Sequence, residues 1–368
     1  MKVALELQPC CGNRSGIGTY TYELAKRLHG DGELAFYGNL FGKGELEQFP
    51  FPIRRVHLLP YGIYRRVWHL IPVTYSMLFP RADLNIFFDY IVPPRVSGHI
   101  MTTIHDMTYF RFPETMERRN LERIRRDIDS SVERSDHILT VSEFSKQEII
   151  SLLGVPPEKV SVVYNAPSIS GETVSVDDLK NRYGIYPPYL LYVGTIEPRK
   201  NVLGILRAFE RLKEEAGIPH QLVLAGGMGW RTKEFQRAVS ESRWKEQVVL
   251  TGYVSGAVKN TLYRYAESFV FPSRYEGFGI PPLEAMSFGC PVICSDAASL
   301  PEVVGDAGEY VKADDEQSIA QGIWRVISQP ERRDAMVESG RTQAKKFNWE
   351  RSAEQLELLC RQVLALEK

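Results

Sequence analysis

The chain has 368 residues, more than one compact core usually holds, so two domains are expected. Its 45 basic and 46 acidic residues nearly balance, which excludes a global attraction to nucleic acid. Apolar residues make up 43% of the chain, and no apolar run approaches the ~20 residues of a membrane-spanning helix. Five cysteines without regular spacing favour a reducing cytoplasm over a disulfide framework or a zinc site.

Short apolar strands alternate with amphipathic helices, a rhythm typical of parallel sheets covered by helices on both faces. In the first half, strands are predicted at Lys2–Leu7, Leu34–Tyr37, Arg54–Leu58, Leu84–Phe88, His99–Ile104, His137–Val141 and Lys159–Val163. Helices are predicted at Thr19–His29, Ile63–Met77, Arg118–Arg134 and Glu143–Leu153. Gly16 and Gly18 fall in the loop before the first helix, where glycine serves either packing or the close approach of a ligand.

The segment 49–82 contains five arginines and no acidic residue. The arginines are Arg54, Arg55, Arg65, Arg66 and Arg81, and the aromatic residues between them are Tyr61, Tyr64, Trp68 and Tyr75. One interpretation is a peripheral contact with an anionic membrane surface. The other is an ordinary helix with buried aromatic side chains and solvated arginines, and we favour it because this helix needs a buried face.

His105 and Asp106 end the fifth predicted strand with two titratable groups. Such a pair is either part of an acid–base site or a structural contact. Asp127 and Asp129 have the spacing of an Asp-x-Asp metal site. They lie in a predicted helix, where positions two apart point to nearly opposite faces, so we expect no metal there.

Between Ser168 and Pro188 the pattern fades into polar residues, glycine and proline, which predicts a linker. Strands then follow at Tyr189–Val193, Gln221–Ala225, Val248–Thr251, Ser268–Phe271 and Pro291–Cys294, and helices at Val202–Glu215, Arg231–Arg243, Ala257–Ala266, Pro281–Phe288 and Trp349–Leu366. The predicted fold class is therefore α/β, with two doubly wound Rossmann-like domains. Their strand ends would face each other across a cleft, where ligands bind in such folds.

Loops at several of these strand ends carry glycine or cations. Gly194 and Gly226 each follow a predicted strand directly. Arg199 and Lys200 lie a few residues beyond Gly194. The two cations are either a solvated pair or groups that neutralise a bound diphosphate.

The most informative segment is Glu276–Gly289, in which a strand leads into two glycines, two prolines and a run of helix formers. Pro281 and Pro282 suit the first helical turn, where an N–H group would lack a partner. The backbone N–H groups of Gly277, Phe278, Gly279 and Ile280 would form an anion site together with the helix dipole. Glu276 and Glu284 flank this site, with Glu284 expected in the first helical turn. Carboxylates beside phosphate donors suit a sugar nucleotide.

These motifs resemble those of the retaining GT-B glycosyltransferases of family four, in particular the bacterial mannosyl- and rhamnosyltransferases. The resemblance covers nearly the whole chain and rests on Glu276 and Glu284 with seven residues between them, on Val193–Asn201 and on Phe347–Ala353. It implies an acceptor-side domain 1–168 that includes the terminal helix 349–368, a linker 169–188 and a nucleotide-sugar-binding domain 189–348.

The resemblance also implies roles for single residues. Arg199 and Lys200 would grip the donor diphosphate, Glu276 would lie at the 3-hydroxyl of the donor sugar, Glu284 would bind the ribose hydroxyls, and His105 would lie near the 6-hydroxyl. The other donor contacts would come from Gly16, Gly18, Gly194, Gly226, Tyr253, Val254 and the loop Gly277–Ile280, with Tyr253 and Val254 at the nucleobase. Asp106 would lie near the acceptor.

The implied activity is a cytoplasmic, metal-independent, retaining transfer of a hexose, mannose or rhamnose being favoured, from a GDP-sugar to a growing glycan or lipid-linked oligosaccharide. No cofactor and no nucleic acid partner are expected, and a bacterial surface polysaccharide is the expected product. The absence of an obvious base suggests front-face attack, in which the leaving phosphate takes the proton of the acceptor. The alternatives are a UDP- or ADP-sugar donor, a sugar-nucleotide epimerase, and a non-catalytic scaffold that binds sugar nucleotides.

Overall fold

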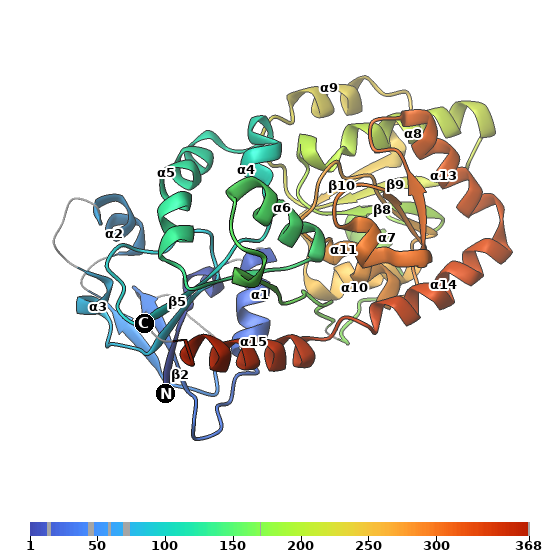
Figure 1. Ribbon diagram of the computed structural model, residues 1–368. Coiled ribbons are helices and arrows are strands. Elements are labelled where there is room, and N and C mark those ends of the chain that lie inside the picture. Colours follow the sequence, from blue (N-terminus) through green and yellow to red (C-terminus); the bar gives the residue numbers. More distant parts are fainter. Residues whose placement is uncertain (13–15, 43–47, 58–59, 69–73, 170, 367–368) are drawn as a thin grey trace. The chain divides into compact units, whose positions relative to one another are not determined.

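The computed structural model describes the chain except for residues 13–15, 43–47, 58–59, 69–73, 170 and 367–368, and it divides into two compact units (Figure 1). Unit 1 contains Met1–Tyr109, Arg118–Asn165 and Asn348–Lys368, and unit 2 contains Phe110–Glu117 and Ala166–Phe347. Each unit is built on a single parallel sheet with helices, so the predicted α/β fold class with two Rossmann-like domains is confirmed.

Unit 1 contains a seven-stranded sheet with the order β3-β2-β1-β4-β5-β6-β7. The strands are β1 (Lys2–Glu6), β2 (Ala35–Phe41), β3 (Ile53–Val56), β4 (Leu84–Phe87), β5 (His99–Thr103), β6 (His137–Thr140) and β7 (Val160–Val162). Every residue of β4, β5 and β6 is buried, as expected where helices cover both faces of a sheet. The direction of winding reverses between β1 and β4, which places a topological switch point at their carboxyl ends.

The helices of unit 1 are α1 (Gly16–Ala25), α2 (Tyr61–Val67), α3 (Tyr75–Leu78), α5 (Arg118–Arg134), α6 (Glu143–Leu153) and α15 (Trp349–Leu364), and α4 (Thr108–Arg111) lies at its boundary. The terminal helix α15 packs beside α1, as Figure 1 shows in dark red and blue. Glu350 lies 2.8 Å from Arg27, and the Ser352 hydroxyl donates to the Tyr164 carbonyl at 2.8 Å. These contacts join helix α15 to unit 1.

Two predicted helices of unit 1 have other limits in the structure. α1 begins at Gly16 instead of Thr19, so Gly16 and Gly18 belong to its first turn and not to a loop. The predicted helix Ile63–Met77 is wrong in extent, because α2 ends at Val67 and α3 begins at Tyr75. Residues 69–73, which include Pro72, lie outside the described residues, as does Leu58 of the predicted strand Arg54–Leu58.

The aromatic residues of segment 49–82 mostly pack into unit 1. Tyr64, Trp68 and Tyr75 are buried, and Tyr64 stacks on Phe41 with ring centroids 5.0 Å apart. Rings with this packing are not available to a lipid surface, so at these positions the structure favours an ordinary buried helix face over a membrane contact. Of the helices that the structure describes, none combines the length and the apolar character needed to cross a bilayer.

Unit 2 contains a six-stranded sheet with the order β10-β9-β8-β11-β12-β13. The strands are β8 (Tyr189–Val193), β9 (Gln221–Ala225), β10 (Val248–Gly252), β11 (Ser268–Phe271), β12 (Val292–Ser295) and β13 (Gly308–Val311). The helices are α7 (Val176–Tyr183), α8 (Val202–Ala216), α9 (Lys233–Glu241), α10 (Gly256–Tyr265), α11 (Ile280–Ser287), α12 (Leu300–Val304), α13 (Glu316–Ser328) and α14 (Pro330–Ala344). The winding reverses between β8 and β11, which gives unit 2 a switch point of its own.

The predicted linker 169–188 is wrong in its secondary structure, because it contains helix α7. Ser175 and Asp178 form a capping box, in which the Ser175 hydroxyl accepts from the Asp178 N–H and the Asp178 carboxylate accepts from the Ser175 N–H. This reciprocal pair stabilises a short helix whose apolar content is too low to reveal it. The structure also adds β13, α12, α13 and α14, none of which was predicted.

One segment from the first half of the chain belongs to unit 2. Residues 110–117 contact the loop after β9 and the loop after β11. The Trp230 indole N–H donates to the Thr115 carbonyl, and the rings of Phe112 and Tyr275 lie 5.4 Å apart. The structure therefore assigns to unit 2 a stretch that the predicted domain 1–168 includes.

Candidate functional site

The switch point of unit 2 brings together two loops that are 76 residues apart in the sequence. After β8 the chain forms the short 3-10 helix η4 (Pro198–Lys200), and after β11 it forms the glycine loop that leads into α11. The Arg274 N–H donates to the Arg199 carbonyl at 2.9 Å, which fixes the two loops to each other. Arg199, Lys200 and Glu276 therefore lie in one place, at the carboxyl end of the parallel sheet.

Four charged side chains form a cluster there. The Arg199 guanidinium lies 2.6 Å from a Glu197 carboxylate oxygen and 3.3 Å from Oε2 of Glu276, and it donates to the Tyr275 carbonyl at 2.5 Å. Lys200 Nζ donates to Oε1 of Glu276 and lies 5.2 Å from the centre of the Phe271 ring. Ser273 donates to the same Oε1 at 2.6 Å. We call Glu197, Arg199, Lys200 and Glu276 the ion cluster.

The ion cluster is largely removed from water. The side chains of Arg199 and Lys200 are each 14% exposed, and that of Glu197 is 2% exposed. Burial raises the pKa of Glu197, although Arg199 and Lys200 oppose this rise. Burial also acts to raise the pKa of Glu276, but Lys200 and Arg199 outweigh it, and the pKa lies below its ordinary value. Glu276 is thus ionised at neutral pH, and two cations balance the two acids.

Lys200 responds in the opposite sense. Burial lowers the pKa of its ammonium group, whereas Glu276 works to raise it. An anion that arrives at Lys200 would favour the charged ammonium form in the same way that Glu276 does. The ion cluster therefore combines charged groups of perturbed pKa with two cationic donors that are partly desolvated, and such donors suit a diphosphate.

The glycine loop after Glu276 holds a defined conformation. Gly279 has φ +107°, and an added Cβ would lie 2.8 Å from Leu300 Cδ2, so only glycine fits. The Ser299 hydroxyl donates to the carbonyl oxygens of Glu276 at 2.9 Å and Phe278 at 2.8 Å. Ile280 begins α11, and the two prolines follow it in the first turn. The prediction of a glycine turn with prolines at a helix N-terminus is confirmed.

Glu284 lies in the second turn of α11, so its expected place in the first turn is wrong. It is buried, and its carboxylate lies 2.6 Å from Lys259 Nζ and 3.1 Å from the Tyr263 hydroxyl, which donates to it. Lys259 and Tyr263 both belong to α10. Glu284 and Glu276 thus have separate partners, and the sequence did not reveal those of Glu284.

Glycines at the ends of β8, β9 and β10 interlock. The Gly194 N–H donates to the Ala225 carbonyl, and the Gly226 N–H donates to the Gly252 carbonyl, both at 2.9 Å. A Cβ on Gly226 would lie 1.9 Å from the Gly194 carbonyl oxygen, so this contact requires glycine. The next loop presents Tyr253 with 77% of its surface exposed and Val254 partly exposed. The loops after β8, β9 and β10 therefore place backbone groups and the exposed Tyr253 ring at the carboxyl edge of the sheet.

The other predicted site residues lie in unit 1. His105 is buried, and its Nε2 lies 2.9 Å from the Phe88 carbonyl oxygen, while the Tyr20 ring meets it edge to face at 5.2 Å. Burial lowers the pKa of His105, so the imidazole is neutral at pH 7. Asp106 accepts from the Thr108 N–H at 2.9 Å at the start of α4. Gly16 and Gly18 begin α1.

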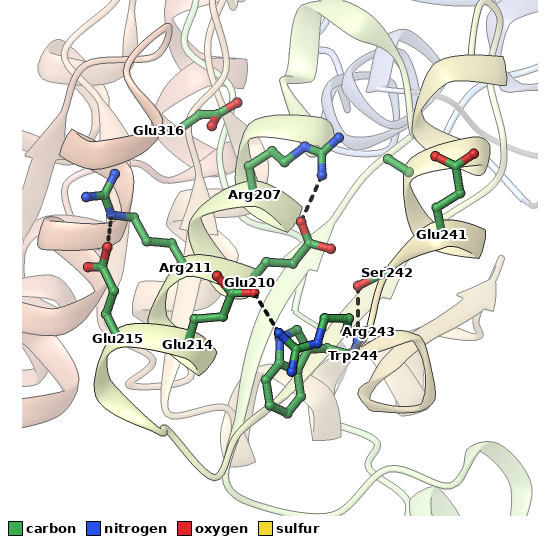
Figure 2. Close-up of a pocket in the computed structure, with 11 residues that line it drawn as sticks. Arg207, Glu210, Arg211, Glu214, Glu215, Glu241, Ser242, Arg243, Trp244 and Glu316 are labelled. Carbon is green, nitrogen blue, oxygen red and sulfur yellow. Dashed lines mark hydrogen bonds and ion pairs between the residues drawn. The ribbon is translucent and has the colours of Figure 1, made fainter.

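A surface groove of about 520 Å³ between α8 and the segment after α9 is a weaker candidate (Figure 2). Its charges pair with one another: Arg207 lies 3.0 Å from Glu210, Arg211 lies 2.9 Å from Glu215, and Arg243 lies 3.6 Å from Glu214. Glu241 and Glu316 add further acids. Because carboxylates outnumber guanidinium groups, the groove disfavours a diphosphate.

The helical Asp-x-Asp pair has the geometry that the sequence predicts. Asp127 is buried and lies 2.8 Å from Arg126, whereas Asp129 is exposed on the same helix α5. The two carboxylates therefore point in different directions. Within the part of the chain that the structure describes, no group of three or more His, Cys, Asp or Glu side chains is arranged to hold a metal ion.

Three residues of the site were not predicted from the sequence. Glu197 holds Arg199, Ser273 holds Glu276, and Ser299 holds the glycine loop. For Glu197 a signal was available, because it lies two residues before Arg199 in the same motif. Ser273 and Ser299 carry no local pattern that distinguishes them from other buried serines.

Two family models match most of the chain. The model for Glycosyltransferase Family 4 matches residues 14–168, and the model for glycosyl transferases group 1 matches residues 176–343. O-antigen chain mannosyltransferase B of Escherichia coli is 33% identical over 372 residues, which cover 95% of this chain and 97% of that protein. O-antigen chain mannosyltransferase RfbU of Salmonella typhimurium is 32% identical over 229 residues, which cover 62% of this chain and 61% of that protein.

The fold is also similar to that of a protein whose structure was solved in complex with UDP and glucose. The Anabaena protein Alr3699/HepE, crystallised with UDP and glucose, superposes with a TM-score of 0.76 at 17% identity and covers 98% of this chain and 99% of its own. This likeness concerns the fold alone, whereas the family models and the full-length relative concern the sequence. The chain belongs to glycosyltransferase family 4 and is a glycosyltransferase of the GT-B fold.

Proposed function

We propose that the chain is a retaining, metal-independent hexosyltransferase that transfers mannose or a related sugar from a GDP-sugar to a growing glycan. The observation that carries this proposal is the ion cluster, in which Arg199 and Lys200 lie beside the glycine loop at the N-terminus of α11. The choice of sugar and acceptor is supported by the two similar proteins named as O-antigen mannosyltransferases.

The chemistry follows from the charge that develops during transfer. As the bond from the anomeric carbon to the diphosphate breaks, negative charge grows on the phosphate oxygens and positive charge grows on the sugar ring. Arg199 and Lys200 are partly desolvated donors, and the N-terminus of α11 adds the positive end of its helix dipole. Preorganised groups of this kind stabilise the leaving group without a metal ion.

Glu276 would remain a hydrogen-bonding group and not a nucleophile. Lys200 and Ser273 both donate to its Oε1, and Arg199 lies 3.3 Å from its Oε2. A carboxylate with both oxygens engaged is poorly suited to attack the anomeric carbon. We therefore favour front-face attack, in which the acceptor oxygen bonds to the anomeric carbon on the side from which the phosphate leaves, and the phosphate oxygen takes the acceptor proton.

Glu284 would bind the ribose hydroxyls of the donor. It is already oriented by Lys259 and Tyr263, so its carboxylate presents a fixed acceptor without further loss of side-chain freedom. Tyr253 and Val254 would lie at the nucleobase, and His105 and Asp106 would serve the reacting face and the acceptor. We place the reaction in the cytoplasm, because all five cysteines are free thiols.

The test is to incubate the purified chain with GDP-mannose, UDP-glucose or ADP-glucose and a mannoside acceptor, with and without EDTA. We expect GDP release that depends on the acceptor and is insensitive to EDTA. The product should be α-linked, and the one-bond C–H coupling of its anomeric carbon would show this. A β-linked product would contradict retention, and loss of turnover in EDTA would contradict metal independence. Turnover only with UDP- or ADP-glucose would reassign the donor.

A further inference from the structure

Asn201 directly follows the two cations of the ion cluster and has an unusual backbone conformation. Its φ is +53° and its ψ is +41°, in the left-handed region where residues other than glycine are uncommon. It is also the N-cap residue of α8. N-cap residues usually have an extended backbone, as Ser175 has before α7 and Ser255 before α10. Strained backbone of this kind concentrates at functional sites, so the conformation of Asn201 calls for a reason beyond capping.

The left-handed conformation sets the direction in which the two cations extend from α8. This helix is fixed in the core of unit 2, where Ile205 and Phe209 are fully buried. The cations belong to η4, which immediately precedes Asn201. Because φ and ψ are the only soft backbone angles of a residue, a change of either at Asn201 would swing η4 relative to α8. Such a swing would carry both cations away from Glu276.

The side chain of Asn201 makes two contacts that hold this conformation. Asn201 is buried, with 6% of its surface exposed. Its Oδ1 accepts from the Gly204 N–H at 3.3 Å in the first turn of α8, and its Nδ2 donates to the Ala313 carbonyl in the loop after β13. A Cβ on Gly204 would lie 2.5 Å from Nδ2 of Asn201, so glycine at this position leaves room for the amide. One side chain thus links the end of η4 both to α8 and to the loop after β13.

A second side chain links η4 to the same loop. Arg274 donates through Nη1 to the Pro198 carbonyl, and its Nε lies 2.6 Å from Oδ1 of Asp314. The Asp314 side chain is 75% exposed, so water screens this ion pair and it contributes little by itself. The buried hydrogen bonds of Asn201 are protected from water, and we expect them to hold η4 more firmly.

We propose that Asn201 is a positioning residue for the donor diphosphate. It holds η4 so that Arg199 and Lys200 present their cationic groups to the phosphate oxygens, without touching the diphosphate itself. The proposal rests on the proposed binding of the diphosphate by the ion cluster. A merely structural cap would stabilise α8 and affect all ligands alike, whereas a positioning residue affects only those ligands that carry phosphate.

The test compares GDP with guanosine by isothermal titration calorimetry on the full-length chain. Asn201→Gly removes both side-chain contacts and still permits the left-handed backbone. We expect GDP affinity to fall about 10-fold or more and guanosine affinity to stay unchanged. Gly204→Ala displaces the Asn201 amide while Asn201 itself is retained, and the same result is expected. Alanine favours a helix more than glycine does, so a weaker α8 would not explain the loss.

Ser175→Gly is the matched control, because Ser175 caps a helix of unit 2 and its side chain contacts Asp178. It should keep the wild-type affinity for both ligands, and the Tm of all three variants should stay close to that of the wild type. Wild-type GDP affinity in Asn201→Gly and Gly204→Ala would overturn the proposal, as would an equal loss of GDP and guanosine binding in Asn201→Gly.

The positioning role and the proposed glycosyltransfer can fail separately. If Lys200→Ala weakens GDP binding and neither Asn201→Gly nor Gly204→Ala does, the positioning role fails and the diphosphate site stands. If Asn201→Gly selectively weakens GDP binding but the wild type turns over no sugar nucleotide, the transfer fails and the positioning role stands.

Discussion

Replacing Arg199 with alanine removes a guanidinium that lies 2.6 Å from Glu197 and 3.3 Å from Glu276. Two losses should follow. Turnover should fall by ~10²–10³-fold, or about 3–4 kcal/mol, the scale of one preorganised electrostatic donor. The buried Glu197 also loses its ion-pair partner, which costs about 3–5 kcal/mol and lowers the Tm by roughly 6–20 °C in a domain of this size.

The double variant Glu197→Gln/Arg199→Ala separates these two losses. Glutamine keeps the shape of Glu197 but carries no charge, so the double variant should recover most of the Tm and little of the turnover. We would measure kcat from GDP release at saturating donor, well below the Tm of the single variant, and Tm by calorimetry. Recovery of turnover to within about 10-fold of the wild type would refute the reasoning, because Arg199 would then act only by neutralising Glu197.

Three further predictions concern other parts of the molecule. Glu284→Ala should raise the donor KM by ~10–100-fold with little change in kcat, because it removes a charged hydrogen-bonding group from bound ribose; a fall in kcat at constant KM would contradict the ribose assignment. Since the pKa of Glu6 is about 8 in the folded protein and 4.5 ordinarily, unfolding free energy should fall as the pH rises through this window, by at most about 5 kcal/mol, and urea titrations should show no such fall in Glu6→Leu. Gly226→Ala should unfold unit 2, because its Cβ would lie 1.9 Å from the Gly194 carbonyl oxygen, whereas Gly227→Ala, which meets nothing within 4 Å, should keep the wild-type circular dichroism spectrum.

Most strands could be predicted from the sequence because parallel strands buried on both faces are short apolar runs. β8, β9 and β11 have the predicted bounds. β13 was missed because its four residues include Gly308 and the buried Glu309, whose charge is balanced by arginines from α13 and α14. An acidic residue in a short segment indicates an exposed loop, and the sequence alone does not show the arginines that pair with Glu309 in the fold.

The limits of helices were harder to predict where the decisive contact is not local. α7 depends on a two-residue capping box and not on an apolar face. Residues 110–117 belong to unit 2 through Trp230 and Tyr275, which lie more than 100 residues further along the chain. Periodicity describes the residues of one element, so it carries no information about such long-range contacts.

In the candidate site too, features that depend on local sequence could be predicted, whereas long-range contacts could not. Arg199, Lys200 and the glycine loop are readable because each belongs to a compact motif. Their contact with Glu276 spans 76 residues and is made by the switch point between β8 and β11. The resemblance of the motifs suggested that Glu276 serves the donor sugar, and the structure adds that its carboxylate forms ion pairs with both Arg199 and Lys200.

The central claim is that the ion cluster binds the diphosphate of the donor, and Lys200→Ala tests it most directly. Isothermal titration calorimetry would compare GDP with guanosine, which has the same base and sugar but no phosphate. The control is Lys312→Ala, because Lys312 also forms an ion pair in unit 2, with Asp296. We predict that Lys200→Ala weakens GDP binding by about 10-fold or more and leaves guanosine binding unchanged, while Lys312→Ala affects neither. Unchanged GDP affinity in Lys200→Ala would contradict the claim.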